Sequence, residues 1–216
     1  MLKLYAYWRS SASHRIRIAL NLKGLEYEIL PVNLVRDGGE QFSAAYRTVN
    51  PQSRVPLLVD GGFSIGQSQA ILEYLEARFP TPALAPREPQ PLARVRAFCQ
   101  TIVADIQPLQ NLSVLNYLGD TLKLDEAQRS AWLRHWITRG LVALEESLHA
   151  EPDTPFVFGD SPGWADCVLV PQIFAAQRFG CDATHFARLA RVAAHCATLP
   201  AFQRAHPAQQ PDAPAV

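Results

Sequence analysis

The sequence predicts two units of different fold class: an α/β unit over residues 1–82 and an all-helical unit over residues 87–211. In the first part of the chain, short apolar runs typical of strands alternate with helix-like segments. A proline-rich stretch, PTPALAPREPQP at 80–91, then interrupts regular structure, because proline lacks a backbone donor. Beyond it the patterns are helical only. We therefore expect this stretch to link two domains.

The elements of the first unit follow the order βαβββα. An apolar strand at 2–7 precedes a helix at 13–23, in which Ile16, Ala19 and Leu20 share one face and after which Gly24 is a helix stop. The elements after it are a strand at 27–34, a loop with a short helical piece at 37–51, strands at 55–60 and 63–66 joined by the Asp60-Gly61-Gly62 turn, and a helix at 67–79. This is the order of a thioredoxin-like domain.

The second unit is expected to contain helices at 91–119, 125–149, 163–178, 185–197 and 200–205. In the first of these, Gln107, Gln110 and Asn111 recur at helical spacing and predict a polar stripe, with a kink at Pro108. The tail from His206 is polar and rich in proline, so we expect it on the surface without regular structure.

The composition argues against some classes of partner. The 216 residues include 20 basic and 20 acidic ones, whereas nucleic acids and membrane surfaces attract proteins with a basic excess. No apolar stretch approaches the ~20 residues of a membrane span, and the N-terminus does not resemble a signal peptide. We expect a cytoplasmic protein without membrane or nucleic-acid partners.

The four cysteines form no CxxC pair, and the six histidines show no metal-binding spacing. These patterns favour free thiols and no metal site.

Three short stretches predict ligand contacts. SSASHR at 10–15 precedes a helix, and its hydroxyls either cap that helix or donate to an anion such as a thiolate, whose pKa they would lower. SRVP at 53–56 contains an X-Pro bond that, if cis, would turn the Val55 backbone toward a bound peptide. GQSQAI at 66–71 begins another helix, where Ser68 either caps the helix or, with Gln67, binds a carboxylate.

Six motifs together resemble the zeta class of glutathione transferases: WRSSASHRIRIAL, NPQSRVPLLV, IGQSQAILEYLE, IQPLQNLSVLNYL, GDSPGWADCVLVPQ and AQRFGCD. Their order and spacing match over nearly the whole chain, from about Lys3 to Pro211. The resemblance implies a thioredoxin-like domain that binds glutathione as cofactor, a helical domain that helps form a pocket for an acidic substrate, and a homodimer. It also implies glutathione-dependent cis–trans isomerisation of maleylacetoacetate, a step in aromatic amino-acid breakdown.

The resemblance assigns roles to residues. Ser10, with Ser11 beside it, would be catalytic by hydrogen bonding to the glutathione sulfur, and Arg9 and Arg178 would bind the substrate carboxylates. The implied glutathione contacts are Ser10, Ser11, Ala12, Ser13, His14, Arg15, Gln41, Val55, Gln67, Ser68, Gln107, Asn111, Leu112 and Ser113.

Two positions depart from the family pattern. Ala12 stands where a cysteine is usual, and Gly163 replaces the hydroxyl residue that usually begins the helix containing Asp166. Glycine is still a tolerable cap. Because the serine turn at 10–15 contains no cysteine, the nucleophile must come from glutathione.

Two other functions stay open. A related enzyme of the same class would act on maleylpyruvate or on halogenated acids. A protein of another class would be a non-catalytic scaffold of the glutathione transferase fold. Ser10, Gln67, Ser68 and Asn111 argue against the scaffold, because a scaffold does not need all of these ligand-facing groups.

Overall fold

The computed structural model describes residues 1–214, and the contacts between residues divide the chain into two compact units. The first unit comprises Met1–Leu84 and the segment from Thr198 onward, and the second comprises Ala85–Ala197. The expected end of the helical unit at residue 211 is therefore wrong. The reason is that helix α9 (Pro200–Ala205) packs against helix α1 (Ser11–Leu22) of the first unit.

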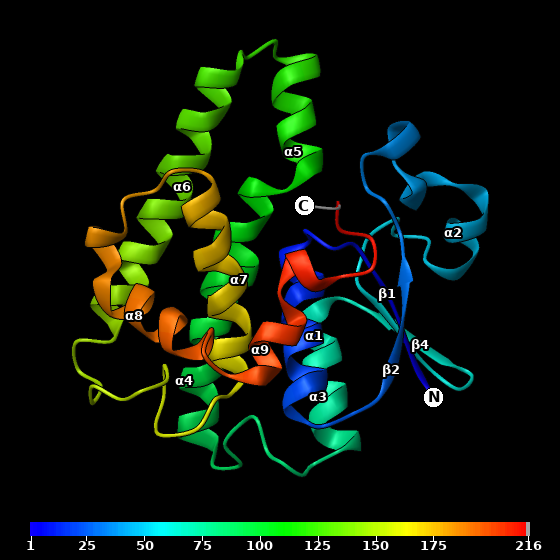
Figure 1. Ribbon diagram of the computed structural model, residues 1–216. Helices are drawn as coiled ribbons and strands as arrows, with labels where there is room; N and C mark the ends of the chain where they lie inside the picture. Colours follow the sequence, from blue (N-terminus) through cyan, green and yellow to red (C-terminus); the bar gives the residue numbers. More distant parts are fainter. Residues whose placement is uncertain (215–216) are drawn as a thin grey trace. The chain divides into compact units, whose positions relative to one another are not determined.

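The first unit is built on a four-stranded sheet (Figure 1). In chain order it contains β1 (Leu2–Ala6), α1, β2 (Tyr27–Pro31), η1 (Arg36–Gly38), η2 (Glu40–Phe42), α2 (Ala44–Val49), β3 (Leu57–Asp60), β4 (Phe63–Gly66), α3 (Ser68–Arg78), α9 and η7 (Pro207–Gln209). The strands lie in the order β2-β1-β3-β4, with β1 parallel to β2 and antiparallel to β3. The unit is thioredoxin-like, which confirms the predicted fold class.

Helix α1 forms the centre of the first unit. It packs against α3 and α9, and α1 and α3 lie side by side next to the sheet in Figure 1. Ile16, Ala19 and Leu20 are fully buried, as predicted. The same enclosure buries two charged side chains, Arg15 and Arg17, which are 0% and 1% exposed. A buried guanidinium must find hydrogen-bond acceptors, so both arginines are tied to neighbouring segments.

The tail that follows α9 is folded rather than irregular. Pro207 is buried, and Gln210 is only 7% exposed. The Gln210 side-chain amide donates to the carbonyl oxygens of Arg204 and His206, at 3.0 and 2.9 Å. The expectation of a tail without regular structure is thus wrong at η7, residues 207–209, whereas residues 210–214 contain no helix or strand and residues 215 and 216 lie outside the described residues.

The second unit is helical, as predicted. It contains α4 (Pro89–Gln100), η3 (Thr101–Ile106), η4 (Gln107–Gln110), α5 (Leu112–Asn116), η5 (Tyr117–Thr121), α6 (Glu126–Ser147), α7 (Trp164–Arg178), η6 (Ala183–Phe186) and α8 (Ala187–Cys196). Helix α7 is largely buried because α4, α6 and α8 all pack against it. Helix α4 begins inside the predicted linker, at Pro89, because proline is well tolerated in a first helical turn.

The single helix predicted over 91–119 is broken. Pro108 lies in the tight turn η4, and Asn111 then has an extended backbone with ψ 145°. Asn111 caps the next helix, since its side chain accepts a hydrogen bond from the backbone N–H of Ser113 at 3.1 Å. The predicted kink is confirmed, but Gln107 and Asn111 do not share one helical stripe.

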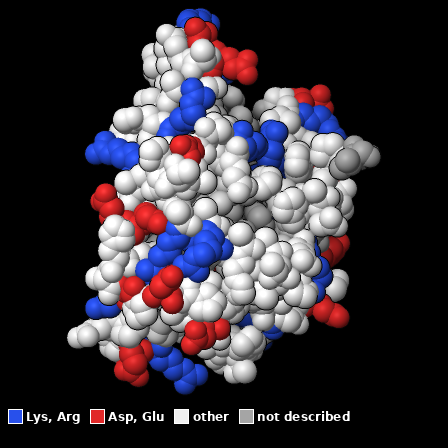
Figure 2. All heavy atoms as spheres, turned by 60° about the vertical axis from the view of Figure 1, so that its left-hand side comes forward, with Lys and Arg blue, Asp and Glu red and all other residues white. Residues whose placement is uncertain are grey.

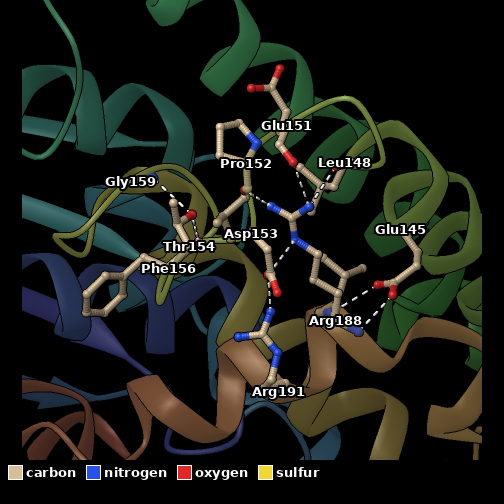
Figure 3. Close-up of polar contacts among 12 residues, drawn as sticks. Glu145, Leu148, Glu151, Pro152, Asp153, Thr154, Phe156, Gly159, Arg188 and Arg191 are labelled. Atoms are coloured by element: carbon tan, nitrogen blue, oxygen red, sulfur yellow. Dashed lines mark hydrogen bonds and ion pairs between the residues drawn. The ribbon is translucent and has the colours of Figure 1, made fainter.

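A long loop between α6 and α7 is fastened by Arg188 (Figure 3). The Arg188 guanidinium donates to three backbone carbonyl oxygens, those of Leu148, Glu151 and Pro152. Asp153 pairs with the guanidinium groups of both Arg188 and Arg191. One arginine of α8 therefore fixes the first part of a loop that leads to the N-terminus of α7.

Charged groups of both signs are interspersed on the face shown in Figure 2, across a surface that is largely uncharged. Among residues 1–214, no helix is long and apolar enough to cross a membrane. All four cysteines are free, with Cys99, Cys167 and Cys196 buried and Cys181 partly exposed.

Candidate active site

The serine turn begins helix α1. Ser10 is the N-cap, and its hydroxyl oxygen accepts a hydrogen bond from the backbone N–H of Ser13 at 3.2 Å. A hydroxyl that accepts in this way keeps its own proton for donation. The first turn of α1 contains no acidic residue. Ser10 can therefore cap the helix and donate to an anion at the same time, so the two roles open from the sequence are compatible.

The other residues of the serine turn differ in exposure. Ser11 and Ala12 are partly exposed, whereas Ser13, His14 and Arg15 are buried. The Ser13 hydroxyl lies inside, where it accepts from the backbone N–H of Tyr7 at 3.4 Å. Burial, with Arg17, His206 and Arg15 nearby, holds the pKa of His14 well below its ordinary value, so His14 is neutral. These three side chains support the turn from within, and their contacts with glutathione stay predictions.

A second helix N-terminus of the same unit carries the other predicted serine. Gln67 is the N-cap of α3, and Ser68 is the first helical residue, so the expectation that Ser68 caps the helix is wrong. The Ser68 hydroxyl instead accepts from the Arg15 guanidinium at 2.8 Å. It keeps its own proton for a ligand, as Ser10 does. Arg15 thus joins α1 to the start of α3 and adds positive charge behind Ser68.

Gln67 has an uncommon backbone conformation. Its φ of 63° lies in the left-handed region, which non-glycine residues rarely adopt and which recurs at ligand sites. Its side-chain amide is exposed and donates to the Gln52 side chain at 2.9 Å. Gln52 received no role from the sequence, because nothing in NPQSRVP marks it as close to Gln67.

The loop before β3 is held by its own side chains. The Tyr46 hydroxyl and the Asn50 amide both donate to the carbonyl oxygen of Arg54, at 2.6 and 2.7 Å. The Val55–Pro56 peptide bond that follows is cis, a point that the sequence left open.

Gln41 does not present its side chain to solvent. It is 6% exposed, and its amide nitrogen lies 3.5 Å from the carbonyl oxygen of Leu34, to which it donates. The side chain also lies against Gly39. Gln41 therefore supports the loop around η1 and η2 from inside, and its contact with glutathione stays a prediction.

The remaining predicted residues belong to the second unit. Gln107 and Leu112 are partly exposed, and Ser113 is exposed with its hydroxyl donating to the Asn111 side chain at 3.1 Å. Arg178 is an exposed residue at the end of α7, and its guanidinium lies over the Phe179 ring, 4.2 Å from the ring centroid. In the first unit, Arg9 is exposed and stacks similarly on Trp8, at 5.4 Å.

The site of the first unit fits a small anionic peptide. Two helix N-termini each place a hydroxyl that has a proton to donate, and one of them is backed by a buried guanidinium. Helix N-termini bind thiolates and carboxylates because their backbone N–H groups and dipole are positive. Glutathione carries both kinds of anion, so the donor set of this unit suits it.

Comparison with known proteins agrees with this chemistry. Residues 1–77 match the family model described as glutathione S-transferase, N-terminal domain. The chain is 51% identical to maleylacetoacetate isomerase of Pseudomonas aeruginosa over 99% of this chain and 100% of the relative. It also resembles a solved structure of maleyl pyruvate isomerase, described as a bacterial glutathione S-transferase in zeta class, with 46% identity, a TM-score of 0.95, and coverage of 98% and 100% of the two chains. The chain belongs to the zeta class of glutathione transferases.

A further relative bears on the cofactor. The crystal structure of maleylacetoacetate isomerase from Anaeromyxobacter dehalogenans contains glutathione bound in its active site. It is 45% identical to this chain with a TM-score of 0.87, and the match covers 99% of this chain and 98% of that one.

Two residues that support the serine turn of the first unit, Arg17 and Asp212, were not predicted from the sequence. No sequence pattern around either residue predicts these contacts, because they form only when the C-terminal tail packs against α1.

Proposed function

We propose that this protein is a glutathione-dependent isomerase that converts maleylacetoacetate to fumarylacetoacetate in the breakdown of aromatic amino acids. The observation that carries the proposal is the Ser10 N-cap, a hydroxyl with a proton to donate at the N-terminus of a helix whose first turn contains no acidic residue. The identity of 51% over the full length of a maleylacetoacetate isomerase supports the choice of substrate.

Glutathione, when bound, supplies a thiolate that adds to the cis double bond of the substrate and is expelled after rotation about the resulting single bond. The protein's part is to lower the pKa of that thiol. The Ser10 hydroxyl donates to the sulfur, and the N–H groups at the start of α1 favour its negative charge. Ser11, partly exposed and next along the turn, is the second candidate donor.

The start of α3 binds the γ-glutamyl end of glutathione in this proposal. The Ser68 hydroxyl and the adjacent backbone N–H groups receive the carboxylate, with Arg15 behind Ser68 to stabilise the charge. Gln67 donates beside them, and the Val55 backbone pairs with the peptide. Gln107, Asn111, Leu112 and Ser113 are the proposed contribution of the helical unit, as the family resemblance implies.

The substrate carries carboxylates and a carbonyl on which negative charge develops. We assign Arg9 and Arg178 to these groups because each presents an exposed guanidinium, which forms short charge-assisted hydrogen bonds to carboxylates.

We further propose that the protein acts in the cytoplasm as a homodimer. A solution mass of twice the 24.0 kDa chain is the test of the homodimer.

A second candidate is isomerisation of maleylpyruvate, favoured by 46% identity and a TM-score of 0.95 to a maleyl pyruvate isomerase. The deciding experiment measures kcat/KM for maleylacetoacetate and for maleylpyruvate with glutathione present. We expect maleylacetoacetate to be preferred by at least about tenfold, which corresponds to ~1.4 kcal/mol in transition-state binding. The reverse preference selects the second candidate. Binding of glutathione without turnover of either substrate would make the protein a scaffold.

A further inference from the structure

The C-terminal segment of the first unit folds onto the back of the serine turn. Helix α9 packs along α1, and the Asn21 side chain donates to the carbonyl oxygen of Ala201 at 2.9 Å. The tail beyond α9 is closed by the buried Gln210 amide. The segment is therefore a folded part of the unit and can fix whatever it touches.

Arg17 is the first of two links from this segment to the serine turn. Its Nε atom donates to the carbonyl oxygen of Ala205 in the segment at 3.0 Å. Its Nη2 and Nη1 atoms donate to the carbonyl oxygens of Trp8 and Tyr7, at 3.0 and 3.4 Å. Burial lowers the pKa of Arg17 to about 10, so the guanidinium still carries its charge at neutral pH.

Asp212 is the second link. Its carboxylate accepts a hydrogen bond from the backbone N–H of Trp8 at 2.9 Å. Both backbone groups of Trp8 are therefore fixed by side chains, the N–H by Asp212 and the carbonyl by Arg17. The carbonyl of Tyr7, which Arg17 also binds, accepts from the backbone N–H of Ser10 at 3.0 Å. The tail thus reaches Ser10 through a short chain of hydrogen bonds.

We infer that Arg17 and Asp212 are positioning residues, through which the C-terminal segment fixes the Tyr7–Trp8 backbone and so aims the Ser10 hydroxyl at the sulfur of glutathione. The inference rests on the proposed function of Ser10. Positioning of this kind matters because a displacement of about 1 Å in a catalytic group can reduce a rate about a hundredfold. The segment lies far from Ser10 in sequence, yet it is part of the machinery that activates the thiol.

The test compares Asp212→Ala, which removes the acceptor of the Trp8 N–H, with Asp212→Asn, which keeps one. Asp153→Ala is the matched control, because it removes an acidic residue from a loop of the second unit, where Asp153 binds Arg188 and Arg191. Two readouts are used: hydrogen exchange of the Trp8 amide without ligand, and the thiol pKa of bound glutathione, followed by thiolate absorbance.

For Asp212→Ala we expect about tenfold faster exchange at Trp8, a thiol pKa raised by about half a unit, and kcat about fivefold lower with little change in KM for glutathione. Asp212→Asn should recover most of each loss, and Asp153→Ala should change neither readout. An Asp212→Ala variant whose Trp8 exchange and thiol pKa match those of the wild type overturns the inference. So does an equal change in Asp153→Ala. If the wild type itself does not lower the thiol pKa, the proposed role of Ser10 is wrong, while the exchange data still decide whether the tail fixes Trp8.

Discussion

Helices α1 and α7 both begin at the end of a fastened loop, but their N-termini are satisfied in different ways. At α7 the protein supplies its own anion: the Asp166 carboxylate accepts from the backbone N–H groups of Gly163 and Val157, at 2.8 and 2.9 Å. At α1 the cap is the hydroxyl of Ser10, and no acidic residue lies in the first turn. The first arrangement is closed and structural, whereas the second leaves positive potential for an external anion.

The loops in front of these helices are fastened by the same device. Arg17 in the first unit and Arg188 in the second each donate to three backbone carbonyl oxygens. Arg188 fixes the loop that leads to the closed N-terminus of α7, as Figure 3 shows for its first part. Arg17 fixes the loop that leads to the N-terminus of α1, where no acidic residue lies in the first turn. The difference between the ligand site and the structural site therefore lies in the groups at the helix start, Ser10 at α1 and Asp166 at α7, and not in the arginine that fastens the loop.

The largest expected effect comes from closing the α1 site with an internal anion, as at α7. Ser10→Asp keeps a good helix cap, so the melting temperature should stay close to that of the wild type. The new carboxylate would lie where the thiolate must bind, and two like charges about 4 Å apart near a protein surface repel by about 4 kcal/mol. We expect kcat/KM to fall about a thousandfold. A variant with more than a tenth of wild-type activity would contradict the assigned position of the thiolate.

Substitution of Arg17 and of Arg188 should both lower the stability of the protein, but only substitution of Arg17 should change the thiol pKa of bound glutathione. Arg17→Met removes the guanidinium donor from three carbonyl groups, of which that of Tyr7 keeps the Ser10 N–H, so we expect a loss of about 3 kcal/mol in unfolding free energy together with a raised thiol pKa. Arg188→Met should lower stability by a smaller amount, about 1–2 kcal/mol, because its guanidinium is partly exposed, and should leave the thiol pKa unchanged. Equal effects of both variants on the thiol pKa would erase the distinction between the two loops.

The buried carboxylate at α7 should give the second unit a pH dependence. Burial raises the pKa of Asp166 to about 6 from 3.8, despite the hydrogen bonds that its charged form accepts. The folded protein thus favours the protonated carboxyl, so this contribution to stability is full below pH ~4 and is lost as the pH rises to about 6. We expect the stability difference between the wild type and Asp166→Asn to shrink by roughly 2–3 kcal/mol over that interval. Denaturant unfolding at several pH values measures it, and a difference independent of pH would contradict this assignment.

The exposed arginine at the end of α7 should matter for charged substrates only. Loss of a charge-assisted contact costs about 1.5–3 kcal/mol, so Arg178→Met should lower kcat/KM for a dicarboxylate about ten- to a hundredfold. A neutral electrophile such as a chloronitrobenzene should be affected much less. Equal losses on both substrates would mean that Arg178 is structural.

Much of the fold could be predicted from sequence because it depends on local patterns. The alternation in LKLYA and the apolar face of Ile16, Ala19 and Leu20 are visible along the chain, and so is the cap that Gly163 and Asp166 form at α7. The extent of the helical unit could not be predicted. Assigning α9 to the first unit requires knowing that it packs on α1, a contact between residues far apart in sequence.

The candidate site was predictable in its exposed part only. Ser10 and Gln67 lie at helix starts, as the patterns SSASHR and GQSQAI indicate. The buried support was not predictable, because Arg15 and Arg17 look like surface charges until α3 and α9 cover them. The same reason explains Ser68, whose hydroxyl binds Arg15 instead of capping α3.

The most direct test of the account is a titration of glutathione bound to the wild type and to Ser10→Ala, followed by thiolate absorbance. Alanine cannot donate to the sulfur, whereas the N–H groups at the start of α1 remain. We expect the wild type to hold the thiol pKa below the ~8.5 of a free thiol, and Ser10→Ala to raise it toward that value while turnover falls at least about tenfold. An unchanged thiol pKa in Ser10→Ala would contradict the claim that this hydroxyl activates the thiol and would transfer the role to Ser11.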